Sequence, residues 1–479
     1  MKRSERAREL GQYFTPREAA GFVLEAARGL VGCAGPIRLL DPACGDGVFL
    51  ELALERGAAA RSDVFGIEID PDHARAGSRL GLGERLALAD ALADPLPPAH
   101  ESARRAGFDL VVGNPPFGGG RGGGRLEMRF LERFAVLAGP GGAGGVILPS
   151  GIFANATSQA LRDRLLESVA PTAVVELPAG TFRRTGAAAR TCALFFTKRR
   201  ALDSDLCAFV RCPDRVDPRA HFDSALRAVA NPGAGGARRV PVRDLAGRRW
   251  DPAYWCHEAD SVLAGARVPL EPLGRFVEHI TYGPIVTGGR RKMDAPPAET
   301  GVSVIGLREL AATGVDLRRA RKVCAGSLRD PPRCRLRRGD IVMARSGAGS
   351  LMKGRLAVFD GPDPATVGCF VDLVRLKGMD PGYAALCLRS RVCRVQVERI
   401  ANGVGTPNIS FGEIKALMIP RLDPGAEARF ARLERSARDS HEEALGAGRQ
   451  PLAAARHLAA AVGMLDEAVF GGNARTRPA

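Results

Sequence analysis

The stretch that decides the fold is RLLDPACGDG, residues 38–47. It begins as a short apolar run, reaches Asp41, and passes through a turn containing Gly45 and Gly47 before the helical pattern of Val48–Arg56 begins. Glycine allows a positive φ angle and lets the backbone approach a ligand closely. A strand, a glycine-bearing turn and a helix start, in this order, predict a nucleotide-type site at the carboxyl end of a parallel strand.

Outward from this stretch, strand and helix patterns alternate over residues 1–200. Apolar runs bounded by turn residues predict buried parallel strands, and Ser158–Val169 has helical spacing. The alternation predicts a doubly wound α/β sheet. The expected strands are Arg38–Ala43, Val64–Ile69, Leu86–Asp90, Asp109–Asn114, Gly145–Pro149, Ala173–Leu177 and Thr191–Lys198.

Three successive predicted strands end in the carboxylates Asp41, Glu68 and Asp90. A carboxylate after the second strand is well placed to accept both hydroxyls of a ribose, and one after the third can accept a hydrogen bond from an adenine amino group. Acidic surroundings suit an adenosine that carries a positive sulfonium, whereas a diphosphate would require the opposite charge. The pattern therefore favours S-adenosylmethionine (AdoMet) over NAD. Capping of the helices that follow is the structural alternative, and it is compatible with binding.

The fourth predicted strand ends in the most specific motif of the chain, Asn114-Pro115-Pro116-Phe117. The two prolines fix the backbone, so an amide and an aromatic ring are held in set positions. The Asn114 side-chain oxygen and the Pro115 carbonyl can accept both hydrogens of an exocyclic adenine amine, which would free its lone pair for in-line attack on a methyl group. Phe117 would stack on the base, an interaction worth roughly 1–3 kcal/mol. Positioning and electrostatics supply the rate, so neither a covalent intermediate nor a metal is expected.

Residues 11–200 resemble the gamma class of N6-adenine DNA methyltransferases, which includes the modification subunits of type I restriction systems. Gly11–Pro16 (GQYFTP) is similar to the first cofactor motif of that class, and the order of motifs along the chain is the gamma order. The resemblance implies a Rossmann-like, AdoMet-dependent methyltransferase fold with a seven-stranded, mostly parallel sheet and a reversed final hairpin. It also implies flipping of the target adenine out of the duplex, at roughly a few kcal/mol of lost stacking.

The resemblance also implies roles for individual residues. Leu177–Phe182 is similar to a family segment in which a second aromatic residue meets the flipped base, so Phe182 is a candidate for stacking, with a core position as the alternative. The cofactor-binding residues it implies, together with the carboxylates above, are Tyr13, Phe14, Thr15, Asp41, Ala43, Gly45, Glu68 and Asp90.

The rest of the chain differs in composition and in its pattern of apolar residues. Residues 201–268 are rich in Pro, Gly and Arg and are interpreted as a connector, and residues 423–479 predict a helical tail interrupted near Pro451. Residues 269–422 resemble a single target-recognition domain of a type I specificity subunit, notably at Leu336–Gly347 (LRRGDIVMARSG) and Gly405–Ser410. Short strand-like runs predict a β-rich α+β domain there, namely Gly301–Leu307, Asp340–Arg345, Arg355–Phe359 and Cys369–Leu376.

The formal net charge of +16 is unevenly distributed. Residues 1–200 contain 26 basic and 22 acidic residues, which leaves 43 and 31 for the remainder, so the net charges are +4 and +12. A basic C-terminal half suits a polyanion, here double-stranded DNA. Each candidate contact can instead be a solvated surface charge. The candidates are Arg290, Arg291, Lys292, Arg345, Lys353 and Arg355.

Other protein classes are disfavoured. The chain has no apolar run of about 18 residues and no secretory signal, so we expect a cytoplasmic protein without a membrane span. Its 11 cysteines are scattered without a Cys-x-x-Cys motif, so neither a zinc site nor a disulfide framework is expected.

The sequence thus predicts a site-specific adenine-N6 DNA methyltransferase of a restriction-modification or related phage-defence system. Neither a helicase phosphate loop nor a nuclease carboxylate cluster is evident, so any cleavage would come from a separate restriction endonuclease or defence subunit. One recognition domain reads one half-site, so a homodimer through the C-terminal helices is a further hypothesis. Two alternatives stay open: methylation of RNA or of protein glutamine, and a DNA-binding protein with a vestigial methyltransferase fold.

Overall fold

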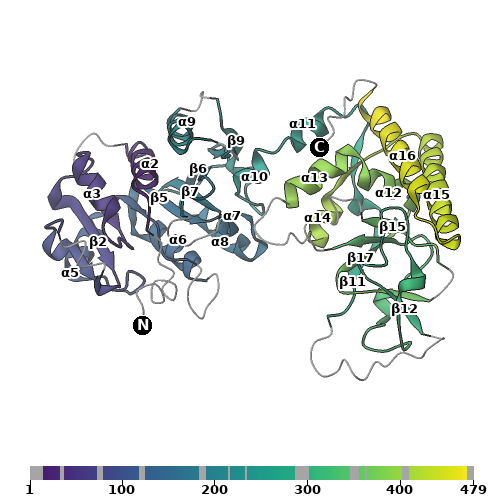
Figure 1. Cartoon of the computed structure of the whole chain (residues 1–479). Coiled ribbons are helices and arrows are strands. Elements are labelled where there is room, and N and C mark those ends of the chain that lie inside the picture. The colour runs from purple at the N-terminus through teal and green to yellow at the C-terminus, as the bar shows by residue number, and fades with distance from the viewer. Residues whose placement is uncertain are drawn as a thin grey trace. The chain divides into compact units, whose positions relative to one another are not determined.

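The computed structural model divides the chain into two compact units, Met1–Cys256 and His257–Ala479 (Figure 1). The boundary falls inside the segment 201–268 that the sequence analysis interpreted as a connector. The structure describes residues 14–32, 37–72, 79–117, 125–182, 190–213, 216–231, 235–285, 301–345, 355–361, 364–401 and 409–471.

A nine-stranded sheet forms the centre of the N-terminal unit, in the order β3-β2-β1-β4-β5-β7-β6-β8-β9. Strand β7 is antiparallel to β5 and β6, and β9 is antiparallel to β8, whereas the other neighbours are parallel. The strands are β1 (Leu39–Asp41), β2 (Val64–Glu68), β3 (Leu86–Leu88), β4 (Phe108–Gly113), β5 (Ala138–Pro149), β6 (Ala170–Glu176), β7 (Thr191–Thr197), β8 (Leu206–Val210) and β9 (Arg238–Pro241).

The expected sheet of seven strands is therefore too small. All seven predicted strands are present, and β7 is reversed as expected, but β8 and β9 extend the sheet beyond β6. Strand β8 (LCAFV) is buried at four of its five positions and pairs with β6. Such a short apolar run is enough for a strand when a sheet edge is available, although its flanks are rich in turn residues.

Helices cover both faces of this sheet. The apolar cluster on one face includes α2 (Arg17–Arg28), α3 (Val48–Glu55) and α9 (Pro218–Ala230). The cluster on the other face includes side chains from α5 (Pro98–Ala106), α6 (Arg125–Leu137), α7 (Ser150–Ala154), α8 (Gln159–Leu165) and α10 (Pro252–Trp255). The N-terminal unit is thus a three-layer α/β/α structure.

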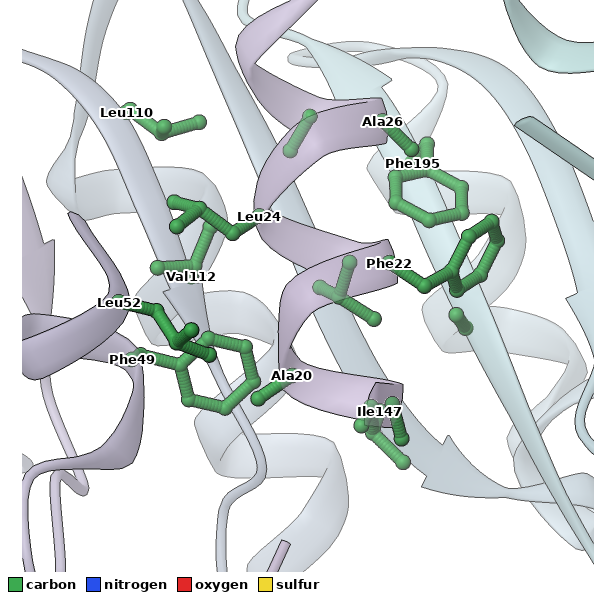
Figure 2. Close-up of a cluster of buried hydrophobic side chains, with 14 of the residues drawn as sticks. Ala20, Phe22, Leu24, Ala26, Phe49, Leu52, Leu110, Val112, Ile147 and Phe195 are labelled. Carbon is green, nitrogen blue, oxygen red and sulfur yellow. The ribbon is translucent and has the colours of Figure 1, made fainter. Parts of the chain in front are cut away.

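Helix α2 lies across the middle strands and positions the segment that precedes it. Figure 2 shows Leu24 of α2 beside Val112 of β4, and Phe22 beside Phe195 of β7. The Phe22 and Phe195 rings meet edge to face, with centroids 5.7 Å apart. Gly145 of β5 allows α2 to approach the sheet closely, because a Cβ at Gly145 would lie 2.8 Å from the Cβ of Ala27 in α2.

The C-terminal unit contains two small sheets and a strand pair. The four-stranded sheet, in the order β11-β17-β14-β15, is antiparallel throughout; the three-stranded sheet has the order β13-β12-β16, and β10 pairs with β18. The strands are β10 (Leu270–Pro272), β11 (Val277–Tyr282), β12 (Val302–Ile305), β13 (Arg321–Val323), β14 (Ile341–Ala344), β15 (Leu356–Val358), β16 (Ala365–Val367), β17 (Val371–Leu376) and β18 (Met418–Pro420).

Helices complete this unit, and the two longest, α15 and α16, lie side by side in Figure 1. Pro451 directly precedes α16, and one apolar cluster joins α12, α15 and α16 to the four-stranded sheet. The helices are α11 (Ala259–Ala264), α12 (Pro381–Arg389), α13 (Arg391–Ala401), α14 (Phe411–Ala416), α15 (Pro424–Gly446) and α16 (Leu452–Phe470). Within the described ranges, no helix has the length and apolar character needed to cross a membrane.

Candidate cofactor and base site

A cavity of about 240 Å³ lies at the carboxyl ends of β1, β2, β3 and β4. Segments far apart in the sequence meet there because neighbouring parallel strands end at the same edge of the sheet. Its lining includes Phe14, Thr15, the turn 41–46, Val48, Phe49, Glu68, Ile69, residues 89–92, Asn114, Pro116, Leu126, Arg129 and Phe130.

The buried carboxylate of Glu68 shapes the turn after β1. Its two oxygens accept hydrogen bonds from the backbone N–H groups of Gly45 and Asp70, both at 2.8 Å. Gly45 and Gly47 have φ angles of +54° and +89°, which side-chain-bearing residues rarely adopt. Glu68 therefore ties the glycine turn to the end of β2, and each oxygen keeps a second lone pair for a ligand.

Asp41 is the most deeply buried of the three strand-end carboxylates, with 1% of the residue exposed. Its Oδ1 accepts a hydrogen bond from the Ala43 N–H at 3.0 Å. Burial raises the pKa of Asp41 to about 8, opposed by the Ala43 bond and reinforced by the nearby Glu68 and Asp46 carboxylates. A cation bound in the cavity would favour the ionised form of Asp41.

Asp90 is exposed at the cavity, where its Oδ1 accepts a hydrogen bond from the Leu92 N–H at 2.8 Å. Ile69, 57% exposed, lines the same cavity together with Leu126 and Phe130 of α6. Apolar side chains together with an exposed carboxylate suit a flat aromatic ring that carries an amino group. These three apolar residues were not predicted from the sequence, although Ile69 directly follows Glu68 and Leu126 and Phe130 have the i, i+4 spacing of one helix face.

Asn114 is held by the segment that precedes α2. Its Nδ2 donates a hydrogen bond to the Oγ1 of Thr15 at 3.0 Å, joining residues 99 positions apart in the sequence. Both residues line the cavity. Because the amide nitrogen donates to Thr15, the side-chain oxygen is oriented as a hydrogen-bond acceptor. The structure thus brings together Phe14 and Thr15 of the first motif with Asn114 and Pro116.

The two candidate stacking residues, Phe117 and Phe182, lie against one another. Each is 2% exposed, and their rings meet edge to face with centroids 6.3 Å apart. Both belong to the apolar cluster beneath α2 and α3, and neither lines the cavity. Either ring would have to become exposed before a base could stack on it.

Two of the six candidate DNA contacts lie on described residues. Arg345 follows β14 and Arg355 precedes β15, and the Ala344 N–H donates to the Arg355 carbonyl at 3.0 Å. Arg355 is exposed, whereas Arg345 is half-buried. The predicted residues that lie outside the described residues are Tyr13, Arg290, Arg291, Lys292 and Lys353. In the part of the chain that the structure describes, no three or more His, Cys, Asp or Glu side chains gather as a candidate metal site.

A family of known proteins matches the N-terminal unit. Residues 2–218 match the family model described as N-6 DNA Methylase. This range contains the whole cavity lining, including Asp41, Glu68 and Asp90, and the Asn114–Phe117 motif. No curated protein matches the chain.

Several solved structures are similar to this chain. The modification subunit of a putative type I restriction enzyme from Vibrio vulnificus is 23% identical, with 52% of this chain and 60% of that chain covered and a TM-score of 0.41. The type IIL restriction-modification enzyme MmeI in complex with DNA is 12% identical, with 99% and 78% covered and a TM-score of 0.53. The DrdV–DNA complex is 12% identical, with 92% and 58% covered and a TM-score of 0.51.

The extent of these matches differs. The chain spans 60% of the Vibrio vulnificus subunit, and the match covers about half of this chain. The matches to MmeI and DrdV extend over nearly the whole chain, so the likeness of fold includes both units.

Proposed function

We propose that this protein transfers the methyl group of AdoMet to the N6 amine of an adenine in double-stranded DNA. The observation that carries the proposal is that Asn114 and Pro116 line the same cavity as Asp41, Glu68 and Asp90. The match of residues 2–218 to the N-6 DNA methylase family supports the same chemistry. The acceptor and the cofactor would therefore meet at the carboxyl ends of β1–β4.

The donor set of the cavity fits AdoMet. When bound, AdoMet supplies a methyl group activated by a positively charged sulfur. Glu68 would accept hydrogen bonds from the ribose hydroxyls, and Asp90 would accept one from the adenine amino group. Ile69, Leu126 and Phe130 offer apolar surface to the adenine ring.

Asn114 and Pro115 would activate the acceptor amine. The Asn114 side-chain oxygen and the Pro115 carbonyl would accept the two N6 hydrogens, which draws the nitrogen towards a tetrahedral geometry and frees its lone pair. The amine held in this way would accept the methyl group from the sulfonium, S-adenosylhomocysteine would be left, and the surplus N6 proton would pass to water. Thr15 would hold the amide through the 3.0 Å hydrogen bond.

The adenine would be flipped out of the duplex into this site. Phe117 and Phe182 would then turn from their mutual edge contact to stack on the base, and that stacking would offset part of the lost duplex stacking. Both rings are buried in the structure, so this turn would have to accompany entry of the base.

The C-terminal unit would choose the target site. It carries most of the excess positive charge of the chain, as a phosphate-binding surface requires. The fold likeness to MmeI and DrdV, both solved with DNA, extends over this unit and supports the role. The protein would then serve a restriction-modification or phage-defence system, with a separate endonuclease or defence subunit and a homodimer through the C-terminal helices as further parts of the proposal.

The test is transfer of radiolabelled methyl from AdoMet to unmethylated duplex DNA, followed by nucleoside analysis. We expect N6-methyladenine with the wild type, none with Asn114→Ala, and wild-type incorporation with Asn155→Ala, an exposed asparagine of the same unit. Label in RNA or in protein glutamine instead of DNA would favour the corresponding alternative. AdoMet binding without transfer to any of them would contradict catalysis by this chain alone.

A further inference from the structure

One arginine of the C-terminal unit is held in a fixed position at the end of its strand. The guanidinium carbon of Arg345 lies 3.7 Å from the centroid of the Tyr282 ring and 5.5 Å from that of Phe411. Its Nη1 lies 3.4 Å from Oδ1 of Asp372, whose side chain is 2% exposed. Aromatic stacking and the buried carboxylate together set the plane of the guanidinium.

Arg345 nevertheless keeps access to a ligand. Its side chain is 23% exposed. A guanidinium has five N–H donors, and the described residues accept a hydrogen bond from one of them, the Nη1 group that faces Asp372. Arg345 therefore presents further donors in a fixed orientation.

Two large apolar side chains lie exposed on the chain segments next to those that hold Arg345. The Phe370 carbonyl accepts a hydrogen bond from the Arg345 N–H at 2.9 Å, and Ile285 follows Tyr282 at the end of β11. Phe370 is 56% exposed and Ile285 is 70% exposed. Both line a cavity of about 310 Å³ whose charged lining residues are Arg321, Arg329 and Glu309, and which Arg345 itself does not line. Exposed apolar groups next to cations mark a surface that contacts a partner, and the cations match a polyanion.

The opposite end of the same two strands provides an internal comparison. Arg375 of β17 donates two hydrogen bonds to Asp340, which directly precedes β14, at 2.8 and 2.7 Å. The Arg375 side chain is 15% exposed. This pair closes one end of β14 and β17 with shorter contacts than the single 3.4 Å contact of Arg345. The stacking and exposure of Arg345 are therefore not needed to join the two strands.

We propose that Arg345 contacts a base edge in the major groove and determines the preference at one base pair of the target, with the exposed Phe370 next to it, directly before the neighbouring strand β17. The inference rests on the proposed function, because it takes duplex DNA as the ligand. Arginine pairs with guanine through O6 and N7, and Phe370 would pack on the methyl group of a neighbouring thymine.

The geometry favours a base over a phosphate as the partner of Arg345. Phosphate contacts are made by many flexible surface cations and carry no sequence information. Reading a base edge requires a planar fork in a set orientation, and Tyr282 and Asp372 provide that orientation before DNA arrives. A preorganised side chain also loses less conformational freedom on binding.

The test is selection of bound sequences from a pool of randomised duplexes by the full chain. We expect the wild type to enrich a motif, and Arg345→Ala and Arg345→Lys to lose roughly ten- to hundredfold preference at one base pair of it. Lysine keeps the charge but lacks the planar fork. The matched control is Arg319→Ala in the same unit, whose side chain is 79% exposed, and it should leave the motif unchanged. An unchanged motif with Arg345→Ala, or no motif with the wild type, would overturn the inference.

The selection separates this inference from the proposed function. It requires no methyl transfer, so a chain that enriches a motif but methylates nothing contradicts the methyltransferase proposal alone. If Arg345→Ala lowers the melting temperature, the inference is tested with Arg345→Lys and Phe370→Ala instead. Phe370 is exposed, so its truncation spares the core. An unchanged motif in both of these variants would overturn the inference.

Discussion

The side chain of Asn114 donates a hydrogen bond of 3.0 Å to the hydroxyl of Thr15. This bond joins the end of β4 to the segment before α2 and fixes the orientation of the amide that would hold the acceptor amine. The orientation of the Asn114 amide is therefore set by a residue 99 positions away in the sequence.

Removal of that hydroxyl should slow catalysis. We expect Thr15→Ala to lower kcat roughly two- to tenfold, because one hydrogen bond contributes about 0.5–1.5 kcal/mol to holding the amide in place. Steady-state methyl transfer to duplex DNA measures the effect. Thr15→Ser keeps the hydroxyl and should retain most of the activity, and wild-type kcat in Thr15→Ala would show that the bond has no part in positioning.

Gly113 should tolerate no side chain. A Cβ there would lie 2.6 Å from Oδ1 of Asp41 and 3.2 Å from Cζ of Phe134. We expect Gly113→Ala to lower the free energy of unfolding by about 1–3 kcal/mol in urea titrations, the usual effect of overpacking a core. Gly32 of the same unit meets no atom within 4 Å, so Gly32→Ala should change stability by less than about 0.5 kcal/mol. Equal stabilities of the two variants would contradict the close contact.

Asp41 should make the N-terminal unit less stable as the pH rises. Its pKa is about 8 in the folded protein, against an ordinary value of 3.8. Between these values the folded state binds more protons than the unfolded state, so this group's stabilising contribution is fully present below pH 3.8 and is lost progressively up to about pH 8. Urea titrations at several pH values should show a steeper decline for the wild type than for Asp41→Asn. Parallel curves would refute the shifted pKa.

The same carboxyl group should couple cofactor binding to proton release. A sulfonium in the cavity favours ionised Asp41, so AdoMet should bind more tightly as the pH rises from 7 towards 9, across the pKa of about 8. Calorimetry in two buffers with different ionisation enthalpies would measure the released proton. Asp41→Asn should bind without that release, and a wild type that releases none would contradict the coupling.

Much of the sheet could be predicted because each of its first seven strands contains a short apolar run. The carboxylates Asp41, Glu68 and Asp90 could then be placed together, because neighbouring parallel strands end at the same edge of a sheet. Strands β8 and β9 could not, because their burial depends on the open edge that β6 provides and their own flanks resemble loops.

Side-chain environments were harder to predict than strand positions. Phe117 and Phe182 were expected at the base, but their burial against one another arises from a contact between segments 65 residues apart. Likewise, the sequence marked Arg345 only as one basic residue among many. Its distinct character comes from Tyr282 and Asp372, which the antiparallel pairing of β11, β17 and β14 brings to it.

The different contacts at the two ends of β14 and β17 are also useful for directed evolution. Asp340 and Arg375 pair at one end of the two strands, whereas positions 345 and 370 lie at the other end. A library randomised at positions 345 and 370 would therefore vary the exposed surface at that end. Its members would be screened for folding before they are sorted for new recognition properties, because position 345 also pairs with the buried Asp372.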